Sequence, residues 1–253
     1  MKLIAMNDKP LISVITVTYN AADVIEKTML SLKSQDYKDF EHLVIDGSSK
    51  DDTIAKIKAY SLPQTRIISE PDKGLYDAMN KGLHLAKGEY VIFLNAGDSF
   101  NNPATLRNYA DKAKDGEDII YGDTIIVDNE GKKISDRHLS APDKITKKSF
   151  SDGMLICHQA FMVKKDLTSS YDINYRFSAD YDWCINCISK ADPKKCTNLY
   201  QVTINYLNDG LTDNNKFKSL RERFRIMVKH YGLPVTLTRH FSFLFRALKR
   251  GSL

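Results

Sequence analysis

The chain has 253 residues, 42% of them hydrophobic, and its 37 Lys and Arg against 32 Asp and Glu give a net charge of +5. This size and composition suit an α/β protein with a real core and argue against disorder. No apolar run approaches the roughly 18 residues of a membrane span, and the apolar start at Leu3 is too short for a secretory signal. We therefore expect a protein of the cytoplasm or of the inner face of the cell membrane.

The first hundred residues alternate between short β-branched runs and helical patterns. Strands are predicted at 11–18, 40–46, 66–69 and 90–94, and helices at 22–34, from about 50 with Ser49 as N-cap, and at 75–86 with Gly88 at the end. Such alternation predicts βαβ units and a parallel sheet, whose ligands bind outside the carboxyl ends of the strands. Polar residues follow each strand and should gather at one edge: Tyr19, Asn20, Asp46, Ser48, Glu70, Asp72, Asn95 and Asp98.

The second half is less regular. The patterns predict a helix at 103–113, a hairpin of strands at 119–127 and 132–135, strands at 154–163 and 196–207, and helices at 179–190, 217–231 and 234–250. We predict one domain over residues 1–215 and a helical C-terminal extension over residues 216–253.

The sequence lacks the motifs of several common classes of protein. No Gly-x-Gly-x-x-Gly follows the first strand, which argues against a dinucleotide-binding oxidoreductase, and no Gly-x-x-x-x-Gly-Lys-Ser/Thr loop is present for a P-loop hydrolase. Cys184 and Cys187 have the spacing of zinc and redox sites. They lie inside a predicted helix without a second Cys/His pair, so we expect buried thiols there.

Three ordered motifs carry a resemblance. They are Thr-Val-Thr-Tyr-Asn at 16–20, Asp-Gly-Ser-Ser-Lys-Asp at 46–51 and Gly-Glu-Tyr-Val-Ile-Phe-Leu-Asn-Ala-Gly-Asp at 88–98. Together they resemble the family 2 glycosyltransferases of GT-A fold, and the segment 69–82 is similar to the branch that builds bacterial surface polysaccharides. The resemblance implies a Rossmann-like, mostly parallel central sheet flanked by helices.

The resemblance also implies a donor site for a nucleotide-sugar. Thr18, Tyr19 and Asn20 would line the nucleoside pocket, and Asp46 would accept a hydrogen bond from the base, for which an ionised carboxylate is suited. The segment that follows the third strand would complete the donor side, with Lys73 on the phosphates or the base edge. Its other donor-side residues are Glu70 and Asp77.

A metal ion is implied as well. Asp98 matches the last acid of the family's Asp-x-Asp motif, which holds Mg²⁺ or Mn²⁺ against the diphosphate. The first acid of that motif is replaced by Ala96, so we expect metal binding to depend on the bound nucleotide.

The acceptor side begins at Asp180, which matches the family's catalytic base at the start of a helix. The alternative is that Asp180 only caps this helix. Asp182 is the second candidate and an expected acceptor contact. His158 and Gln159, on the predicted strand 154–163, would touch the acceptor or the diphosphate, or else form a structural pair at the core edge. The segment 209–212 resembles a Gly-rich loop near the phosphates.

The C-terminal region is strongly basic. From residue 221 onward it has one acid, Glu222, against eight basic residues: Arg221, Arg223, Arg225, Lys229, Arg239, Arg246, Lys249 and Arg250. Its last helix spaces Phe241, Leu244, Phe245 and Leu248 as one apolar face. Such a basic amphipathic helix could dock on its own domain, lie on an anionic membrane or form a dimer contact.

The resemblance implies an inverting glycosyltransferase that moves one sugar from a UDP- or GDP-type donor to a saccharide or lipid-linked saccharide acceptor. A catalytically inactive GT-A scaffold that binds nucleotide or a partner stays open because of Ala96 and Ala179, and a sugar nucleotidyltransferase is the other alternative. No aromatic-basic strand motif favours nucleic acid as a partner.

Overall fold

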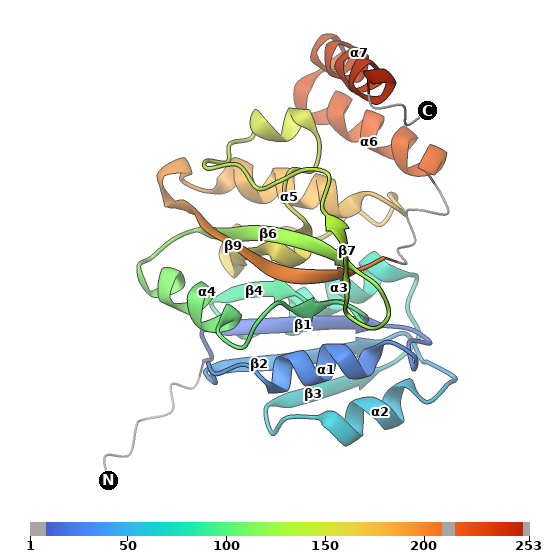
Figure 1. The fold of residues 1–253 in the computed structure, drawn as a ribbon, viewed down its shortest axis with the longest axis vertical. Helices are drawn as coiled ribbons and strands as arrows, with labels where there is room; N and C mark the ends of the chain where they lie inside the picture. The colour runs from blue at the N-terminus through green and yellow to red at the C-terminus, as the bar shows by residue number, and fades with distance from the viewer. Residues whose placement is uncertain (1–8, 209–215, 250–253) are drawn as a thin grey trace.

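One continuous sheet runs through the molecule (Figure 1). The computed structural model describes residues 9–208 and 216–249, and within them nine strands hydrogen-bond side by side. Their order across the sheet is β3 (Thr65–Ser69), β2 (Phe40–Asp46), β1 (Ile12–Thr18), β4 (Tyr90–Phe93), β8 (Phe161–Lys164), β6 (Ile119–Val127), β9 (Cys196–Leu207) and β5 (Ser99–Phe100), with β7 (Lys133–Asp136) paired to β6.

The N-terminal half of the sheet is parallel, as predicted. β1 pairs in parallel with both β2 and β4, and β2 pairs in parallel with β3. Thr18 stands opposite Asp46, and Asp46 stands opposite Ser69, so the carboxyl ends of these three strands share one edge. The polar residues that follow the strands therefore do gather there.

The C-terminal half makes the sheet mixed. β8 runs antiparallel to β4 and β6, β5 runs antiparallel to β9, and β6 is parallel to β9. The predicted hairpin of β6 and β7 is confirmed. The predicted strand 154–163 is wrong before Phe161, because a 3-10 turn, η2 (His158–Ala160), closes there with Ala160 N–H donating to Cys157 O at 2.9 Å. His158 and Gln159 thus lie on a turn.

Helices pack on the faces and at one end of the sheet. They are α1 (Ile25–Lys33), α2 (Thr53–Tyr60), α3 (Leu75–Leu85), α4 (Thr105–Lys114), α5 (Ala179–Lys190), α6 (Lys216–Tyr231) and α7 (Leu233–Lys249). α6 contacts α5, and α7 contacts both α6 and a short 3-10 helix, η1 (Ser149–Asp152). α6 and α7 stack beyond α5 at the end of the molecule farthest from α2 (Figure 1).

Two local predictions were wrong. Ser49 does not cap α2, whose N-cap position is Asp52; the Ser49 hydroxyl donates to Asp46 instead. Gly88 does not end α3, which stops at Leu85. A Cβ at Gly88 would lie 2.5 Å from the backbone nitrogen of Ser13, so glycine is needed there for close approach to β1.

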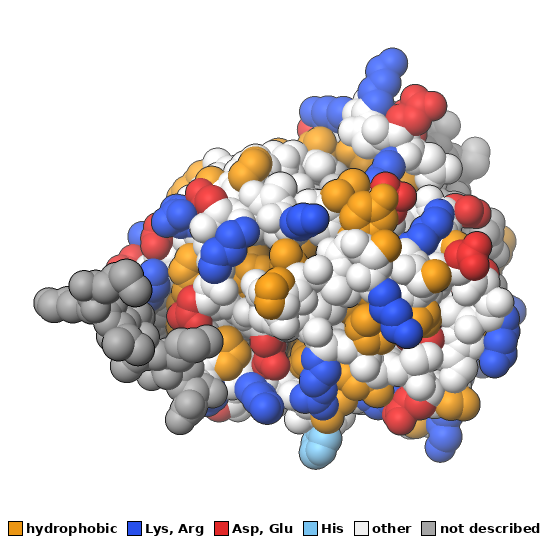
Figure 2. All heavy atoms as spheres, turned by 90° about the horizontal axis from the view of Figure 1, so that it is seen from below, with side chains coloured by type: hydrophobic (Ala, Val, Ile, Leu, Met, Phe, Trp, Pro, Cys, Tyr) orange, Lys and Arg blue, Asp and Glu red, His pale blue; other side chains and the backbone are white. Residues whose placement is uncertain are grey.

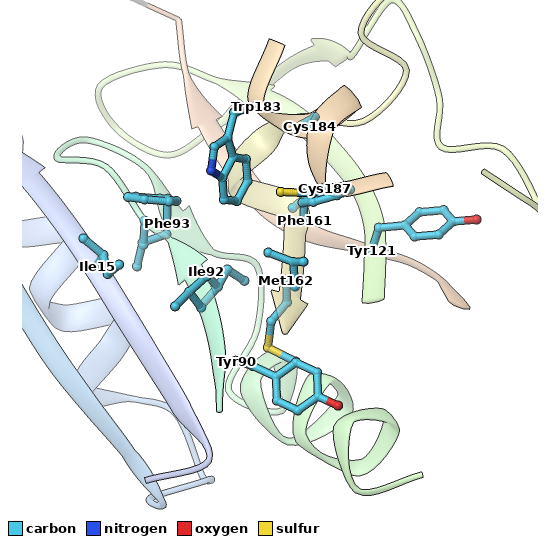
Figure 3. Packing of buried hydrophobic residues seen from close by; sticks show 14 of the residues in the cluster. Ile15, Tyr90, Ile92, Phe93, Tyr121, Phe161, Met162, Trp183, Cys184 and Cys187 are labelled. Atoms are coloured by element: carbon cyan, nitrogen blue, oxygen red, sulfur yellow. The ribbon is translucent and has the colours of Figure 1, made fainter. Parts of the chain in front are cut away.

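The core joins both halves of the chain. All seven residues of β1 are buried, and Phe93 of β4 meets Trp183 of α5 with ring centroids 5.9 Å apart (Figure 3). Cys184 and Cys187 lie in the same cluster as free thiols with no exposed surface, as expected. Burial raises the pKa of both thiols, so they behave as small apolar side chains.

The surface shows how the positive excess is distributed. On the face seen from below Figure 1, Lys and Arg are interspersed with Asp and Glu, without one continuous field of a single sign (Figure 2). None of the helices in the described ranges is long and apolar enough to cross a membrane.

Candidate functional site

Asp180 lies in the first turn of α5, where two other parts of the chain hold its carboxylate. The Tyr76 hydroxyl of α3 donates to Asp180 Oδ1 at 3.1 Å, and His158 Nδ1 of η2 lies 3.4 Å from Asp180 Oδ2. The Asp180 side chain is 17% exposed, so a solvent-borne group can still reach it. Its carboxylate has partners beyond its own helix, and helix capping alone does not account for this arrangement.

The charge state of Asp180 follows from this setting. Burial by itself raises the pKa of Asp180, but the hydrogen bond and charge of His158 lower it, as do the charge of Arg223 and the hydrogen bond from Tyr76. The lowering contributions win, so the pKa lies below its usual value of 3.8. Asp180 is therefore ionised at neutral pH and able to accept a proton.

Asp98 follows β4 and is almost fully buried. Gln159 Nε2 donates to its Oδ2 at 2.7 Å, and the backbone N–H of Leu207 donates to its Oδ1 at 3.0 Å. Burial raises the pKa of Asp98 to about 7, although both hydrogen bonds act in the opposite direction. Without a nearby cation, this carboxyl is partly protonated at neutral pH.

The turn η2 brings the two carboxylates together. His158 faces Asp180 while the next residue, Gln159, faces Asp98, so adjacent side chains join groups 82 positions apart in the sequence. The Cys157 thiol donates to Gln159 Oε1 at 2.7 Å, which leaves the amide nitrogen pointing at Asp98. His158 Nε2 also lies 3.4 Å from the Asn95 amide, which ties η2 to the end of β4.

Asp46 lies at the same sheet edge within a separate hydrogen-bond network. It is fully buried, and its carboxylate accepts hydrogen bonds from Ser49 N–H at 3.0 Å, from the Ser69 hydroxyl at 2.6 Å and from the Ser49 hydroxyl. Asn20 and Ser48 beside it have left-handed backbones, with φ of 47° and 63°. Such strain in residues other than glycine is concentrated at ligand sites.

The remaining donor-side residues lie around this network. Tyr19 is 63% exposed, and the Thr18 hydroxyl is buried with no hydrogen-bond partner. Lys81 forms an ion pair with Glu70 at 3.0 Å and lies 3.9 Å from Asp77. Asp77 also accepts from the Lys73 backbone N–H at 3.0 Å, while the side chain of Lys73 is left exposed.

Asp182 is not part of the cluster around Asp180. Its carboxylate, 4% exposed, is 3.0 Å from Lys229 Nζ and 2.7 Å from His230 Nε2. Two positions along a helix turn a side chain to the opposite face, so Asp182 anchors α6 while Asp180 faces the turn η2. The expectation that Asp182 contacts acceptor or replaces Asp180 as base does not fit this geometry.

Two expectations fall on parts of the chain that the structure does not describe. The predicted loop 209–212 lies outside the described residues. So do the side chains of three members of the apolar face expected on the last helix: Leu244, Phe245 and Leu248.

Comparison with known proteins gives the family. The model for "Glycosyl transferase family 2" matches residues 13–171, more than half of the chain. The chain belongs to glycosyl transferase family 2.

Relatives agree with this assignment. A "PGL/p-HBAD biosynthesis glycosyltransferase" of Mycobacterium bovis is 35% identical over 224 residues, covering 85% of this chain and 84% of the relative. A "GalNAc(5)-diNAcBac-PP-undecaprenol beta-1,3-glucosyltransferase" of Campylobacter jejuni is 31% identical over 175 residues, covering 66% of this chain and 56% of the relative. This protein is accordingly a glycosyltransferase.

Solved structures confirm the GT-A fold. TarS residues 1–349 of S. aureus, in complex with UDP-GlcNAc, has a TM-score of 0.67 and 19% identity, covering 92% of this chain and 73% of that one. Glucosyl-3-phosphoglycerate synthase of Mycobacterium tuberculosis, in complex with Mn²⁺, UDP and glucosyl-3-phosphoglycerate, has a TM-score of 0.62 and 15% identity, covering 91% of this chain and 83% of that one.

The side-chain oxygens of this glycosyltransferase site suit a metal ion only when a bound substrate supplies further ligands. Among the described residues, no group of three or more His, Cys, Asp or Glu is arranged to hold an ion. Asp98 nevertheless has a free lone pair on each oxygen, and the buried Asn95 side-chain oxygen has no hydrogen-bond partner. This set fits a hard divalent ion that takes most of its ligands from a diphosphate.

Two residues that contribute to the glycosyltransferase site were not predicted from the sequence. Tyr76 lies in the family-like segment 69–82, yet nothing local to it indicates a bond to Asp180. Glu222 of α6 accepts from the backbone N–H groups of both Arg176 and Phe177 at 2.8 Å, just before α5 begins. The sequence does single out Glu222, because it is the one acid in a basic stretch.

Proposed function

We propose that this glycosyltransferase inverts the anomeric centre of a sugar that it moves from a UDP- or GDP-type donor to a saccharide or lipid-linked saccharide. The observation that carries the proposal is the connection of Asp98 to Asp180 through Gln159 and His158. A metal-ligand position after β4 and a base position in α5 are thereby joined through two adjacent side chains of the turn η2. A sugar that bridges them would have its leaving group at one and its acceptor at the other.

In this proposal Asp180 removes the proton from the acceptor hydroxyl. The hydroxyl oxygen forms a bond to the anomeric carbon as the bond from that carbon to the diphosphate oxygen breaks, and the nucleoside diphosphate leaves with that electron pair. A single displacement of this kind inverts the anomeric configuration. The lowered pKa of Asp180 keeps the base ionised before the acceptor arrives.

The other half of the site would bind the leaving group, the nucleoside diphosphate. A divalent ion, when bound at Asp98, would supply charge neutralisation for the diphosphate. Asp46, Thr18, Tyr19 and Asn20 would hold the nucleoside at the ends of β1 and β2. Glu70 and Lys73, between β3 and α3, and Asp77, in the first turn of α3, would border the donor.

The substrate class is supported by the names of similar proteins. The Campylobacter relative is named for an undecaprenol-linked acceptor, and TarS was solved with UDP-GlcNAc. We therefore propose a lipid-linked acceptor at the cytoplasmic face of the membrane, with residues 1–215 as the transferase domain. Residues 216–253 form an extension packed on it or on the membrane.

The test is nucleotide release from a panel of UDP- and GDP-sugars with Mn²⁺ or Mg²⁺ and lipid-linked or free oligosaccharides. We expect turnover by the wild type and a loss of roughly 10²–10⁴-fold in kcat for Asp180→Asn, with donor binding retained. Asp111→Asn, which removes an exposed carboxylate on α4, is the matched control and should keep turnover. Nucleotide binding with no turnover across the panel would favour an inactive scaffold. An α-linked product from an α-linked donor would refute inversion.

A further inference from the structure

One face of α6 packs on the segment that leads into α5. The Ser219 hydroxyl lies 3.0 Å from that of Ser178, which is the N-cap residue of α5. The Glu222 carboxylate accepts from the two backbone N–H groups that precede Ser178. Positions 219, 222 and 223 are three and four residues apart, so they share this face of α6. Arg223 is therefore placed beside the first turn of α5, which carries Asp180.

The positive charge of Arg223 acts on that first turn. Burial raises the pKa of Asp180, and the lowering contributions come from His158 and then from the charge of Arg223. Burial raises the pKa of Tyr181, and the charge of Arg223 opposes that rise. Both effects require a guanidinium close to the start of α5, because the interaction between charges falls with distance.

Arg223 has donors to spare in this position. Within the described ranges it forms no ion pair, neither with Asp180 nor with Glu222, and its Nε is buried without a hydrogen-bond partner. Buried polar groups nearly always have a partner, so this nitrogen indicates a missing acceptor. The Arg223 side chain is only partly buried, which lets a ligand reach it from solvent. The planar fork of N–H groups on a guanidinium matches the oxygens of a phosphate.

The position of α6 favours the acceptor as the source of that phosphate. α6 stacks beyond α5, at the end of the molecule farthest from α2, whereas the nucleoside side lies at the ends of β1 and β2 (Figure 1). Burial, two hydrogen bonds and the charge of His158 act on the pKa of Asp98, while the charge of Arg223 acts on Asp180. Arg223 thus belongs with the base and not with the carboxylate that would meet the donor diphosphate.

On the basis of the proposed function, we propose that Arg223 binds a phosphate group carried by the acceptor sugar whose hydroxyl reacts. The reacting hydroxyl faces Asp180 while the phosphate on the same sugar faces Arg223. The acceptor class is then a sugar phosphate, and the enzyme adds a second sugar to a first one that is linked to phosphate. A neutral saccharide lacks this contact.

The test is calorimetric binding of sugar 1-phosphates and of the same free sugars to the full-length protein with a chelator present. The probes are the 1-phosphates of glucose, galactose and their N-acetylamino forms. We expect one of them to bind at least tenfold more tightly than its free sugar, roughly the effect of one charge-assisted contact. Arg223→Gln should abolish this preference, and Arg223→Lys should keep part of it, because the charge remains without the fork. Arg225→Gln, an exposed position on the same helix, is the matched control and should bind as the wild type does.

Further measurements separate this contact from donor binding, folding and catalysis. The affinity for UDP and GDP with Mn²⁺ should be unchanged in Arg223→Gln; a loss equal to that for the sugar phosphate would assign Arg223 to the donor diphosphate and overturn the proposal. No preference for phosphate in the wild type would also overturn it, as would an equal loss in Arg225→Gln. If Arg223→Gln does not fold, Arg223→Lys decides, and an unchanged preference there would refute the contact. Binding needs no turnover, so Asp180→Asn should keep the preference even if the proposed reaction fails.

Discussion

The hydroxyl of Tyr76 donates a hydrogen bond to Asp180, 3.1 Å away and 104 residues later in the chain. Tyr76 is held in place by an aromatic stack: its ring lies 5.5 Å from that of Tyr171, which lies 5.0 Å from that of Trp183. Burial, and then the charge of Asp180, raise the pKa of Tyr76 well above its usual value. The hydroxyl therefore keeps its proton and serves only as a donor to the carboxylate.

Tyr76→Phe tests this contact. The change leaves the aromatic stack in place and removes one hydrogen bond that lowers the pKa of Asp180. We expect kcat to fall roughly two- to tenfold, as for the loss of one such bond. The acidic limb of the pH–rate profile should move to higher pH, because Asp180 becomes easier to protonate. An unchanged profile with reduced kcat would mean that Tyr76 acts on substrate and not on Asp180.

Glu222→Gln tests whether α6 positions the catalytic helix. A glutamine can accept from only one of the Arg176 and Phe177 N–H groups, and its own amide N–H₂ faces the other. We expect a loss of about 1–3 kcal/mol in unfolding free energy and a lower kcat, with little change in donor KM. Glu222→Asp keeps both carboxylate oxygens, so it is the conservative control and should recover part of kcat. A fall in stability with kcat intact would limit Glu222 to a structural role.

Asp98→Asn tests whether the buried carboxyl makes the stability of the protein depend on pH. The folded-state pKa of about 7 lies above the usual 3.8, so the folded protein holds an extra proton between these values. Wild-type stability should therefore fall as pH rises from about 4 to 7, and the variant lacks this loss. From pH 5 to pH 8 the variant should gain about 2–3 kcal/mol relative to the wild type. Urea unfolding with a chelator present measures this, and a constant difference would refute it.

Gly88→Ala tests the close approach of two backbones. The new Cβ would meet the backbone of Ser13 and Ile12, which lie in the central strand and cannot move aside. We expect a loss of about 1–3 kcal/mol in thermal or urea unfolding. Adding Ser13→Ala should not restore stability, because the nearest atom is a backbone nitrogen. Recovery in the double variant would show that the Ser13 side chain caused the conflict.

Sequence patterns predicted the elements with strong local periodicity. The bounds of β2, α5 and β9 agree with the prediction, and the parallel half of the sheet follows from the alternation of strand and helix. The strand expected at 154–163 was wrong before Phe161, because the apolar residues on both sides of His158 and Gln159 did not reveal the turn between them. In that turn the side chains of His158 and Gln159 contact the carboxylates of Asp180 and Asp98.

The functional site was predicted only in part, because sequence patterns report local structure. Motifs that follow strands could be placed, since parallel strands end at one edge, and Asp98 and Asp180 do lie in one connected cluster. Contacts between residues far apart in the chain could not be predicted from local sequence patterns. Lys229 and His230, which pair with Asp182, are on a helix almost 50 residues away, and no pattern within α5 distinguishes the face of Asp180 from that of Asp182.

The pairing of β4 with β8 sets the two halves of the chain edge to edge, and the groups around Asp180 straddle that seam. Tyr76 comes from one side of it, and His158 and Asp180 come from the other. A protein cut in the loop between α4 and β6 would consequently give two inert fragments. Activity would return only when they reassociate, which makes this chain a candidate for a split reporter.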